Sequence, residues 1–181
     1  MLATFFYLLV ILLLILFLLF MIIYTIALFY SSYMGAPFVP TRQKELKFIL
    51  KEAGLKKDKV FLELGCGDGR VVRTAANQYK VIGYGIDINP FIIIFAKFLA
   101  NIQKINCIFL VKNLFEFNYS RADYIYLFLM PNMLKKLVPI FKRDIKKNTI
   151  VISHGFKLIG CMSKLYRTIQ HEPFPTYFYR F

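Results

Sequence analysis

Three glycines at alternate positions and one later aspartate are the residues of this sequence best suited to hold a ligand. Gly65, Gly67 and Gly69 lie in the segment Val60-Phe-Leu-Glu-Leu-Gly-Cys-Gly-Asp-Gly-Arg70, between a short apolar run and a predicted helix. Such glycines let backbone N–H groups approach a ligand, and the N-terminus of the following helix favours electron-rich groups. Asp87 follows in GIDINP, twenty residues beyond Gly67. A carboxylate at the end of the next strand can accept hydrogen bonds from both ribose hydroxyls, so the pattern predicts a nucleoside site.

The details of the glycine segment indicate which nucleoside fits. The dinucleotide fingerprint G-x-G-x-x-G requires glycine where this chain has Arg70, and the phosphate-loop pattern with Gly-Lys-Ser/Thr is absent. Glu63 precedes the first glycine by two residues. S-adenosylmethionine suits this arrangement, because it has no pyrophosphate and its methionine end carries an ammonium group that a carboxylate can hold. The alternative for Glu63 is a solvent-facing charge at a strand end. Cys66 fills a position of the predicted cofactor loop where a small residue is needed, and a nucleophilic role is not expected.

The elements that must position these residues alternate between apolar strands and helices. Predicted strands occupy 60–64, 80–86, 107–111, 123–130 and 149–153, followed by β-rich runs at 164–170 and 176–181. Predicted helices occupy 41–51, 70–78, 90–104 and 132–146, and the Phe-rich stretch Phe91–Leu99 is expected to pack in the core. Near-continuous apolar strands that alternate with helices are typical of a parallel sheet covered on both faces. The sequence therefore predicts an α/β fold with a doubly wound, mostly parallel sheet and an antiparallel C-terminal hairpin.

The N-terminal segment has a different composition. Residues 1–41 contain no Asp, Glu, Lys or Arg, and the run from Leu2 to Tyr30 is almost entirely apolar. A bilayer core of roughly 30 Å needs about 20 helical residues, and this run is longer. A cleaved signal peptide is the alternative, but it fits poorly because no basic segment precedes the run and the run is too long.

We therefore divide the chain into a transmembrane helix over 1–34, a connector over 35–40 and a folded domain over 41–181. The basic residues that begin at Arg42 predict, by the positive-inside rule, that this domain lies on the cytoplasmic side of a single-pass protein.

The remaining composition narrows the possible partners. Hydrophobic residues make up 58% of the chain and charged residues 19%, which excludes a disordered protein. The whole net charge of +14 lies outside the apolar segment, and a basic face near anionic lipid gains roughly 1 kcal/mol per Lys or Arg. We therefore predict the membrane bilayer as a partner and no nucleic acid, with simple solubility as the alternative reason for the charge. The three cysteines and two histidines form no CxxC or HxxxH pair, so no metal site is predicted.

With ELGCGDG and GIDINP on one α/β domain, residues 41–181 resemble the class I, seven-strand S-adenosylmethionine-dependent methyltransferases. A narrower likeness combines the apolar N-terminal segment with APFVPTRQKELKFIL, LGCGDGR, DINPFIIIFAK, LFLMPNMLKKL and VISHGF. This combination resembles a family of membrane-anchored protein-lysine methyltransferases whose mitochondrial members modify the c-ring protein of ATP synthase and the adenine nucleotide translocase. The resemblance implies a Rossmann-like fold, S-adenosylmethionine as cofactor, and N-methylation of lysine on a membrane protein.

The resemblance also implies a third group of cofactor residues. Many methyltransferases carry an aspartate after the third strand to bind the adenine amino group, and Asn113 takes that place here. Its side-chain oxygen can accept the same hydrogen bond. Ile88 and Leu114, which follow Asp87 and Asn113, complete the predicted cofactor-binding set.

The substrate side is expected beyond the fourth strand, opposite the glycine loop, at Met130, Pro131 and Asn132. This segment lacks the Asp/Asn-Pro-Pro-aromatic tetrapeptide that serves planar amide and base nitrogens, so DNA adenine and glutamine fit poorly as acceptors. His154 follows the fifth strand and is a candidate to orient or deprotonate a substrate amine. The other interpretation of His154 is a hydrogen-bonded histidine at a strand end.

Two other functions stay open at this point. A membrane anchor would also place a lipid or quinone methyltransferase beside the bilayer. A non-catalytic scaffold could bind the cofactor and recruit a partner. The identity of the methyl acceptor and the oligomeric state are not predicted.

Overall fold

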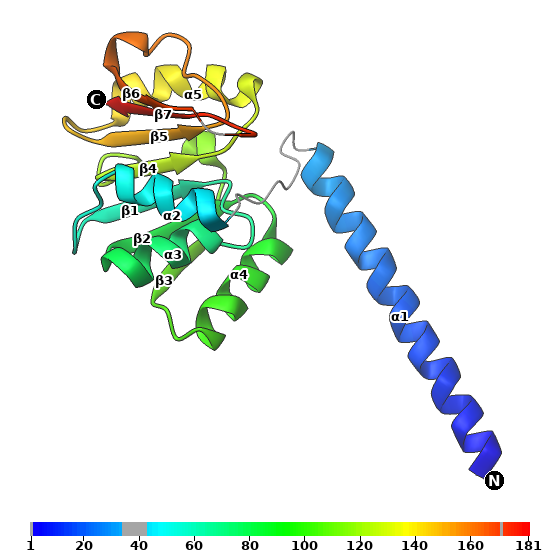
Figure 1. Ribbon diagram of the computed structural model, residues 1–181. Helices are drawn as coiled ribbons and strands as arrows, with labels where there is room; N and C mark the ends of the chain where they lie inside the picture. The colour runs from blue at the N-terminus through cyan, green and yellow to red at the C-terminus, as the bar shows by residue number, and fades with distance from the viewer. Residues whose placement is uncertain (1, 34–42, 171) are drawn as a thin grey trace. The chain divides into compact units, whose positions relative to one another are not determined.

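The computed structural model describes residues 2–33, 43–170 and 172–181, and the chain divides into two compact units, residues 1–37 and 38–181. The first unit contains one helix, α1 (Leu2–Tyr33; Figure 1). Within it, Ala3–Ile26 has a mean hydropathy of 3.4, and none of its strongly apolar stretch is buried. The helix is therefore long and apolar enough to cross a membrane, which makes it a candidate span by length and composition.

The second unit is built on one seven-stranded sheet. Its strands are β1 (Val60–Leu64), β2 (Ile82–Asp87), β3 (Cys107–Val111), β4 (Tyr124–Leu127), β5 (Ile150–His154), β6 (Leu165–Ile169) and β7 (Thr176–Arg180). They lie in the order β3-β2-β1-β4-β5-β7-β6. The first five in that order are parallel, whereas β7 is antiparallel to both of its neighbours. The predicted α/β fold with an antiparallel C-terminal hairpin is confirmed (Figure 1).

Helices cover both faces of this sheet. They are α2 (Gln43–Glu52), α3 (Arg70–Tyr79), α4 (Pro90–Ile102) and α5 (Pro131–Asp144), with short 3-10 turns η1 (Leu114–Glu116) and η2 (Met162–Lys164). Successive strand residues point to opposite faces, and the first strand shows the division. Phe61 clusters with buried side chains of α2 and α3, whereas Leu62 and Leu64 cluster with those of α5. Phe109 of β3 clusters with α3 and α4, so α2, α3 and α4 share one face.

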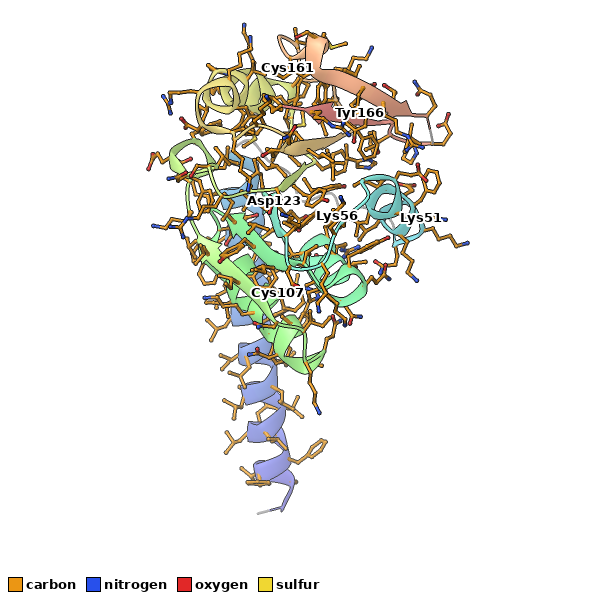
Figure 2. All side chains as sticks on the ribbon, turned by 90° about the vertical axis from the view of Figure 1, so that its left-hand side faces the viewer. Lys51, Lys56, Cys107, Asp123, Cys161 and Tyr166 are labelled. Atoms are coloured by element: carbon orange, nitrogen blue, oxygen red, sulfur yellow. The ribbon has the colours of Figure 1, made fainter. Side chains whose placement is uncertain are left out.

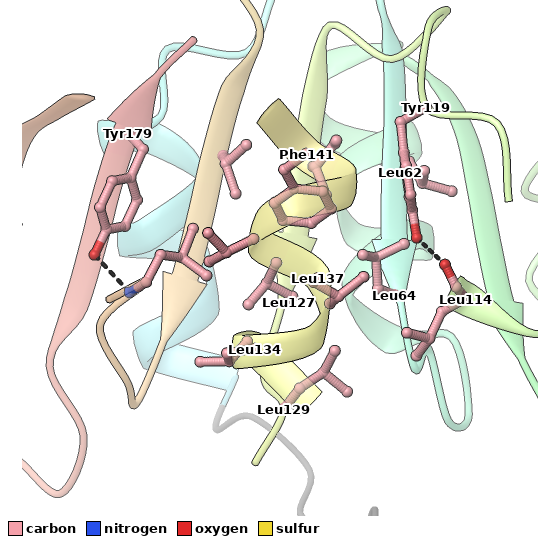
Figure 3. Close-up of a cluster of buried hydrophobic side chains, with 14 of the residues drawn as sticks. Leu62, Leu64, Leu114, Tyr119, Leu127, Leu129, Leu134, Leu137, Phe141 and Tyr179 are labelled. Carbon is pink, nitrogen blue, oxygen red and sulfur yellow. Dashed lines mark hydrogen bonds between the residues drawn. The ribbon is translucent and has the colours of Figure 1, made fainter. Parts of the chain in front are cut away.

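The buried core belongs to the second unit. Figure 3 shows its part beneath α5, where Leu134, Leu137 and Phe141 pack on apolar strand residues. Two buried tyrosines in this cluster have hydrogen-bonded hydroxyls: Tyr119 donates to the carbonyl oxygen of Leu114, and Tyr179 accepts the Leu158 N–H at 2.9 Å. The three buried apolar clusters found among the described residues draw only on residues from Leu46 onward, so this unit carries a core of its own.

Several predicted boundaries are wrong by a few residues. β4, predicted to reach residue 130, ends at Leu127, the last residue that pairs with both β1 and β5. α5 begins at Pro131, where a missing N–H costs no intrahelical hydrogen bond. β2 begins at Ile82, because Lys80 (φ 55°) caps α3 by donating its N–H to the Ala76 carbonyl. The helix start predicted at 41 lies outside the described residues.

Candidate active site

The glycine loop joins β1 to α3 at the carboxyl edge of the sheet. Gly65, Gly67 and Gly69 have φ angles of 67°, 51° and 73°, in the left-handed region that residues with a side chain rarely adopt. At Gly69 there is also no space, since a Cβ would lie 2.4 Å from an aromatic ring of β3. The N–H groups of Gly65 and Cys66 donate to the Ile86 carbonyl at 2.9 and 3.0 Å, which anchors the loop to β2. The backbone path itself therefore requires the alternate glycines.

Asp87, the last residue of β2, links the glycine loop to the helix that follows. One carboxylate oxygen accepts the Gly67 N–H at 3.1 Å, and the other accepts the Asn89 N–H at 3.0 Å. Asn89 in turn caps α4, because its side-chain oxygen accepts the Phe91 N–H at 3.0 Å. Burial raises the pKa of Asp87, and its backbone hydrogen bonds oppose that rise. A carboxylate can accept about four hydrogen bonds, so Asp87 keeps acceptor capacity for a ligand hydroxyl.

Glu63 lies beneath the loop and is only 5% exposed. One of its oxygens accepts the N–H of Val72, in the first turn of α3, at 3.1 Å. Burial raises the pKa of Glu63 well above its ordinary value; Asp68 and Asp87 reinforce that rise, while the Val72 hydrogen bond and Arg73 oppose it. The alternative of a solvent-facing charge at this position is therefore wrong. Asp68 is already paired with the Arg70 guanidinium at 2.9 Å, so Glu63 and Asp87 are the carboxyl groups that would stabilise a cation here, which suits the predicted contact with an ammonium group.

Cys66 packs inward from the loop. Its side chain is buried in a cluster with Val72, Ile93 and Phe109. Burial, reinforced by nearby carboxylates, raises the pKa of the thiol well above its ordinary value, so the thiol stays protonated. Only the thiolate is a strong nucleophile, and Cys66 therefore has a packing environment rather than a nucleophilic one.

Asn113 lies in the loop after β3 and begins the η1 turn. Its Oδ1 accepts the Phe115 N–H at 3.1 Å, and its Nδ2 donates to the Glu116 carboxylate at 2.7 Å. A carbonyl oxygen has two lone pairs, so Oδ1 can still accept a hydrogen bond from a ligand. The side chain is thus held in place with its acceptor partly available.

Ile88 and Leu114 differ in their surroundings. Ile88 follows Asp87 with an exposed side chain, whereas Leu114 is buried and its carbonyl accepts the Tyr119 hydroxyl (Figure 3). Asp87 pairs with Val111 in adjacent parallel strands, so the loops carrying the two predicted residues leave the sheet side by side. Their contact with a cofactor stays a prediction.

The segment after β4 borders the glycine loop. β4 and β1 are parallel neighbours, and a Cβ built on Gly65 would lie only 3.0 Å from Cδ2 of Leu129. Met130 caps α5 with an exposed side chain, and Pro131 and Asn132 are exposed in its first turn. The predicted substrate residues therefore lie beside the predicted cofactor loop at one edge of the sheet.

His154 ends β5 inside the fold. Its ring is 1% exposed, with Nδ1 2.9 Å from the Thr176 hydroxyl oxygen and Nε2 3.9 Å from the Glu45 carboxylate. Phe128 and Phe174 contact the ring nearly edge-on, with centroid distances of 4.6 and 6.0 Å. These are the contacts of a hydrogen-bonded histidine at a strand end, the second of the two sequence interpretations. A catalytic role for His154 stays a prediction.

Sequence reasoning missed the residues that hold these groups in place. Asn89 had a usable signal, because an asparagine directly before proline is a common helix cap. Thr176 and Glu45, the partners of His154, had none, since they are distant in sequence and meet His154 only through the fold.

Solved structures share this architecture. An RNA methyltransferase from Salinibacter ruber, in complex with S-adenosyl-L-homocysteine, matches with a TM-score of 0.74 and 30% identity over 78% of this chain and 93% of that chain. A SAM-dependent methyltransferase from Thiobacillus denitrificans, also in complex with S-adenosyl-L-homocysteine, matches with a TM-score of 0.59 and 17% identity over 73% and 54% of the two chains. Together with the glycine loop and Asp87, this defines the chain as a class I S-adenosylmethionine-dependent methyltransferase.

Sequence comparisons then identify the family. The model of the ANTKMT methyltransferase domain matches residues 63–164, more than half of the chain, and the chain belongs to this family. A protein-lysine N-methyltransferase of Saccharolobus islandicus (strain REY15A) is 37% identical over 129 residues, which are 68% of this chain and 79% of that protein. A lysine N-methyltransferase of Xenopus laevis, named for the c-type subunit of ATP synthase, is 26% identical over 123 residues, 66% of this chain and 53% of that protein. This chain thus spans about half the length of the Xenopus enzyme.

The groups at the carboxyl edge fit S-adenosylmethionine by their chemistry. Asp87 offers acceptors for ribose hydroxyls, and Asn113 offers one for an adenine amino group. The carboxyl groups near Glu63 suit the positive charges of the sulfonium and the methionine ammonium. The assignment of each contact to a particular residue stays a prediction.

Proposed function

We propose that the chain is a membrane-anchored protein-lysine N-methyltransferase that acts on a membrane protein. The observation that carries the proposal is the presence, in one chain, of the carboxyl edge with Gly67 and Asp87 and of α1, a helix without a charged residue. The two curated relatives named for lysine methylation support lysine as the acceptor.

In this proposal, residues 1–34 form a transmembrane helix, 35–40 a connector and 41–181 the catalytic domain. The candidate span Ala3–Ile26 supports the first assignment, since 24 helical residues exceed the length that a bilayer core requires. The basic residues from Arg42 onward support a cytoplasmic position for the domain.

The proposed division of labour follows from the groups at the carboxyl edge. S-adenosylmethionine, when bound, supplies a methyl group that its sulfonium already activates. The chain's own residues therefore chiefly align the acceptor and exclude water. Asp87, Asn113, Ile88 and Leu114 hold the nucleoside end. The glycine loop, whose Gly65 and Cys66 N–H groups anchor it to β2, borders the cofactor without donating these N–H groups to it. The carboxyl groups around Glu63 orient the cationic end.

A lysine amine is nucleophilic only after it loses its proton. Met130 presents an exposed apolar side chain beside the glycine loop, with Pro131 and Asn132 in the next turn. We propose that this segment borders the acceptor and desolvates it, because an apolar environment lowers the pKa of an amine. His154 lies within hydrogen-bond distance of Thr176, so in this scheme it positions β5 and β7 rather than touching the substrate.

The test is the incubation of the purified full chain with membranes and S-adenosylmethionine labelled on its methyl group. Label is expected in a protein band, and acid hydrolysis is expected to release it as methylated lysine. Label in the lipid extract would instead make the protein a lipid or quinone methyltransferase, and label in RNA would make it an RNA methyltransferase. Cofactor binding without transfer to any fraction would support a scaffold.

A truncation tests the anchor separately. Deletion of residues 1–34 should leave cofactor affinity unchanged, because the core of the second unit starts at Leu46. Activity on membranes should fall by about one to two orders of magnitude, since the span confines enzyme and substrate to one thin layer. The remaining activity on membranes should fall further with added salt, because salt screens the attraction between basic residues and anionic lipid. Full membrane activity of the truncated chain at high salt would contradict the anchor and favour a soluble substrate.

A further inference from the structure

Helix α4 has apolar side chains on two opposite sides. Ile93, Ala96 and Ala100 face the sheet and are buried. The outer side was expected to pack in the core, but its three phenylalanines and two isoleucines are each 47% to 64% exposed: Phe91, Ile94, Phe95, Phe98 and Ile102. Steps of three and four residues place these five side chains on one stripe, which we call the α4 stripe.

The neighbouring helix α3, on the same face of the sheet, is an example of a helix whose outer side is polar. It also buries small and branched residues, such as Val72 and Ala75. Its outer side, however, carries the exposed polar residues Asn77 and Gln78. Isolated exposed apolar residues are normal, but a contiguous stripe marks an interaction surface.

We propose that the α4 stripe lies in the interfacial region of a lipid bilayer. The proposal rests on the membrane anchoring proposed above, which restricts where the second unit can be. Only nine residues separate the end of α1 at Tyr33 from the start of α2 at Gln43, and nine residues span at most about 30 Å. A domain of this size on so short a tether stays at the membrane surface, so lipid is its most abundant neighbour.

The chemistry of the stripe suits lipid better than a protein partner. Phenylalanine and isoleucine side chains have no hydrogen-bonding group, whereas protein interfaces usually carry about one hydrogen bond per 100–200 Å². Exposed lysines border the stripe: Lys97 lies on the flank of α4, and Lys104 lies two residues after its end. An apolar stripe edged by cations is typical of helices that lie flat in the headgroup region of an anionic membrane.

The α4 stripe extends the proposed function because it would orient the carboxyl edge of the sheet relative to the bilayer. The side-chain oxygen of Asn89 accepts a hydrogen bond from the first turn of α4, and the N–H of Asn89 donates to Asp87. The stripe therefore begins next to the proposed cofactor residue. Embedding α4 would hold the carboxyl edge at the level of the headgroups, so the substrate lysine is one that lies at that depth.

The absence of tryptophan from the sequence allows a direct test. Phe98→Trp places the chain's single tryptophan on the stripe, and excitation that is selective for tryptophan separates its emission from that of the tyrosines. Tyr166→Trp places one on β6, at a side chain that is also partly exposed (44%). Tyr166 lies on one outer strand of the sheet, and α4 packs near the other outer strand, β3, which carries Cys107 (Figure 2). Six strand spacings separate β6 from β3, which amounts to about 28 Å. The full chain carrying either substitution is reconstituted into phosphatidylcholine–phosphatidylglycerol vesicles with or without bromine on the acyl chains.

Brominated lipid should remove about half of the Phe98→Trp emission, which should also shift to shorter wavelength, and should leave Tyr166→Trp almost unchanged. Phe91→Trp, on the same stripe, repeats the measurement if Phe98→Trp does not fold. If the vesicles float with the protein but the stripe tryptophans resist quenching, the α4 proposal fails and the anchor stands. If the protein does not float with the vesicles, both fail. A shift that grows with the protein-to-lipid ratio without bromine quenching would assign the stripe to a second copy and overturn the proposal.

Discussion

The sheet has one half made of β3, β2 and β1 and another made of β4, β5, β7 and β6, and the two halves hold their polar residues at the carboxyl edge in different ways. At the ends of β1 and β2, Glu63 and Asp87 accept backbone N–H groups. At the end of β5, His154 pairs with the side chain of Thr176 and is enclosed by aromatic rings. Backbone donors hold Asp87 with part of its side chain exposed, whereas aromatic packing encloses His154. We infer from this difference that the ends of β1 and β2 are organised for a ligand and the end of β5 for stability.

The largest effect is expected from Gly67→Val in the ligand half. The added side chain should fill the space that the cofactor needs and strain a backbone with φ of 51°, so binding should fall below detection in calorimetry. Gly54→Val is the matched control, because it has φ of 63° with nothing within 4 Å of an added Cβ. It should lose stability but bind normally. Normal binding by folded Gly67→Val would place the nucleoside site elsewhere.

Asp87→Ala should weaken cofactor binding by about 100-fold, because it removes charge-assisted hydrogen bonds to the ribose. Asp58→Ala serves as the control, since Asp58 is an exposed aspartate paired only loosely with Lys57 at 3.9 Å. Titration calorimetry gives both affinities. Equal affinities would remove Asp87 from the cofactor site and erase the contrast between the two halves.

His154→Ala tests the other half of the comparison. Removal of the ring opens a space among aromatic side chains and leaves the Thr176 hydroxyl without this partner, so urea unfolding should show a loss of about 2 kcal/mol. Cofactor affinity should not change. If the variant keeps wild-type stability but loses turnover with an altered pH profile, His154 acts on the substrate and the second half is catalytic as well.

The smallest effect is expected from Glu63→Gln. Burial raises the folded-state pKa of Glu63 above its ordinary value of 4.5. The folded state then binds the proton more tightly than the unfolded state; this stabilisation is complete below pH 4.5 and lost as pH rises through the folded pKa. Glutamine can still accept the Val72 N–H without a buried charge, so the variant should be more stable than wild type at neutral pH. The difference should shrink as pH falls toward the ordinary pKa. A lower stability of the variant at neutral pH would show that the charge itself holds the loop.

Most of the fold could be predicted because its signals are local. Mostly apolar segments of four to six residues, separated by segments that contain glycine or proline, mark the five parallel strands in order. The side of α4 that is buried could not be predicted, since its apolar residues surround the helix almost completely. Only the packing of Ile93, Ala96 and Ala100 against the sheet shows which side remains outside.

The candidate site divides in the same way. The glycine loop and Asp87 could be predicted, because strand, turn and strand end follow one another within thirty residues of sequence. The burial of Glu63 depends on the strand alternation that turns it toward α3, and this required the sheet. The enclosure of His154 required β7, α2 and the loop after β4 to converge, which no local pattern indicates.

Asn89 connects the proposed cofactor residue to α4 by two hydrogen bonds. Its N–H donates to Asp87, and its side-chain oxygen accepts an N–H from the first turn of α4. A ligand held by Asp87 and a membrane that holds α4 would therefore act on the same residue. Thermodynamic linkage makes any such coupling reciprocal. If vesicles tighten cofactor binding by some factor, the cofactor must tighten vesicle binding of the second unit by the same factor. The enzyme would then be loaded with cofactor preferentially at the bilayer, where the proposed function places its acceptor.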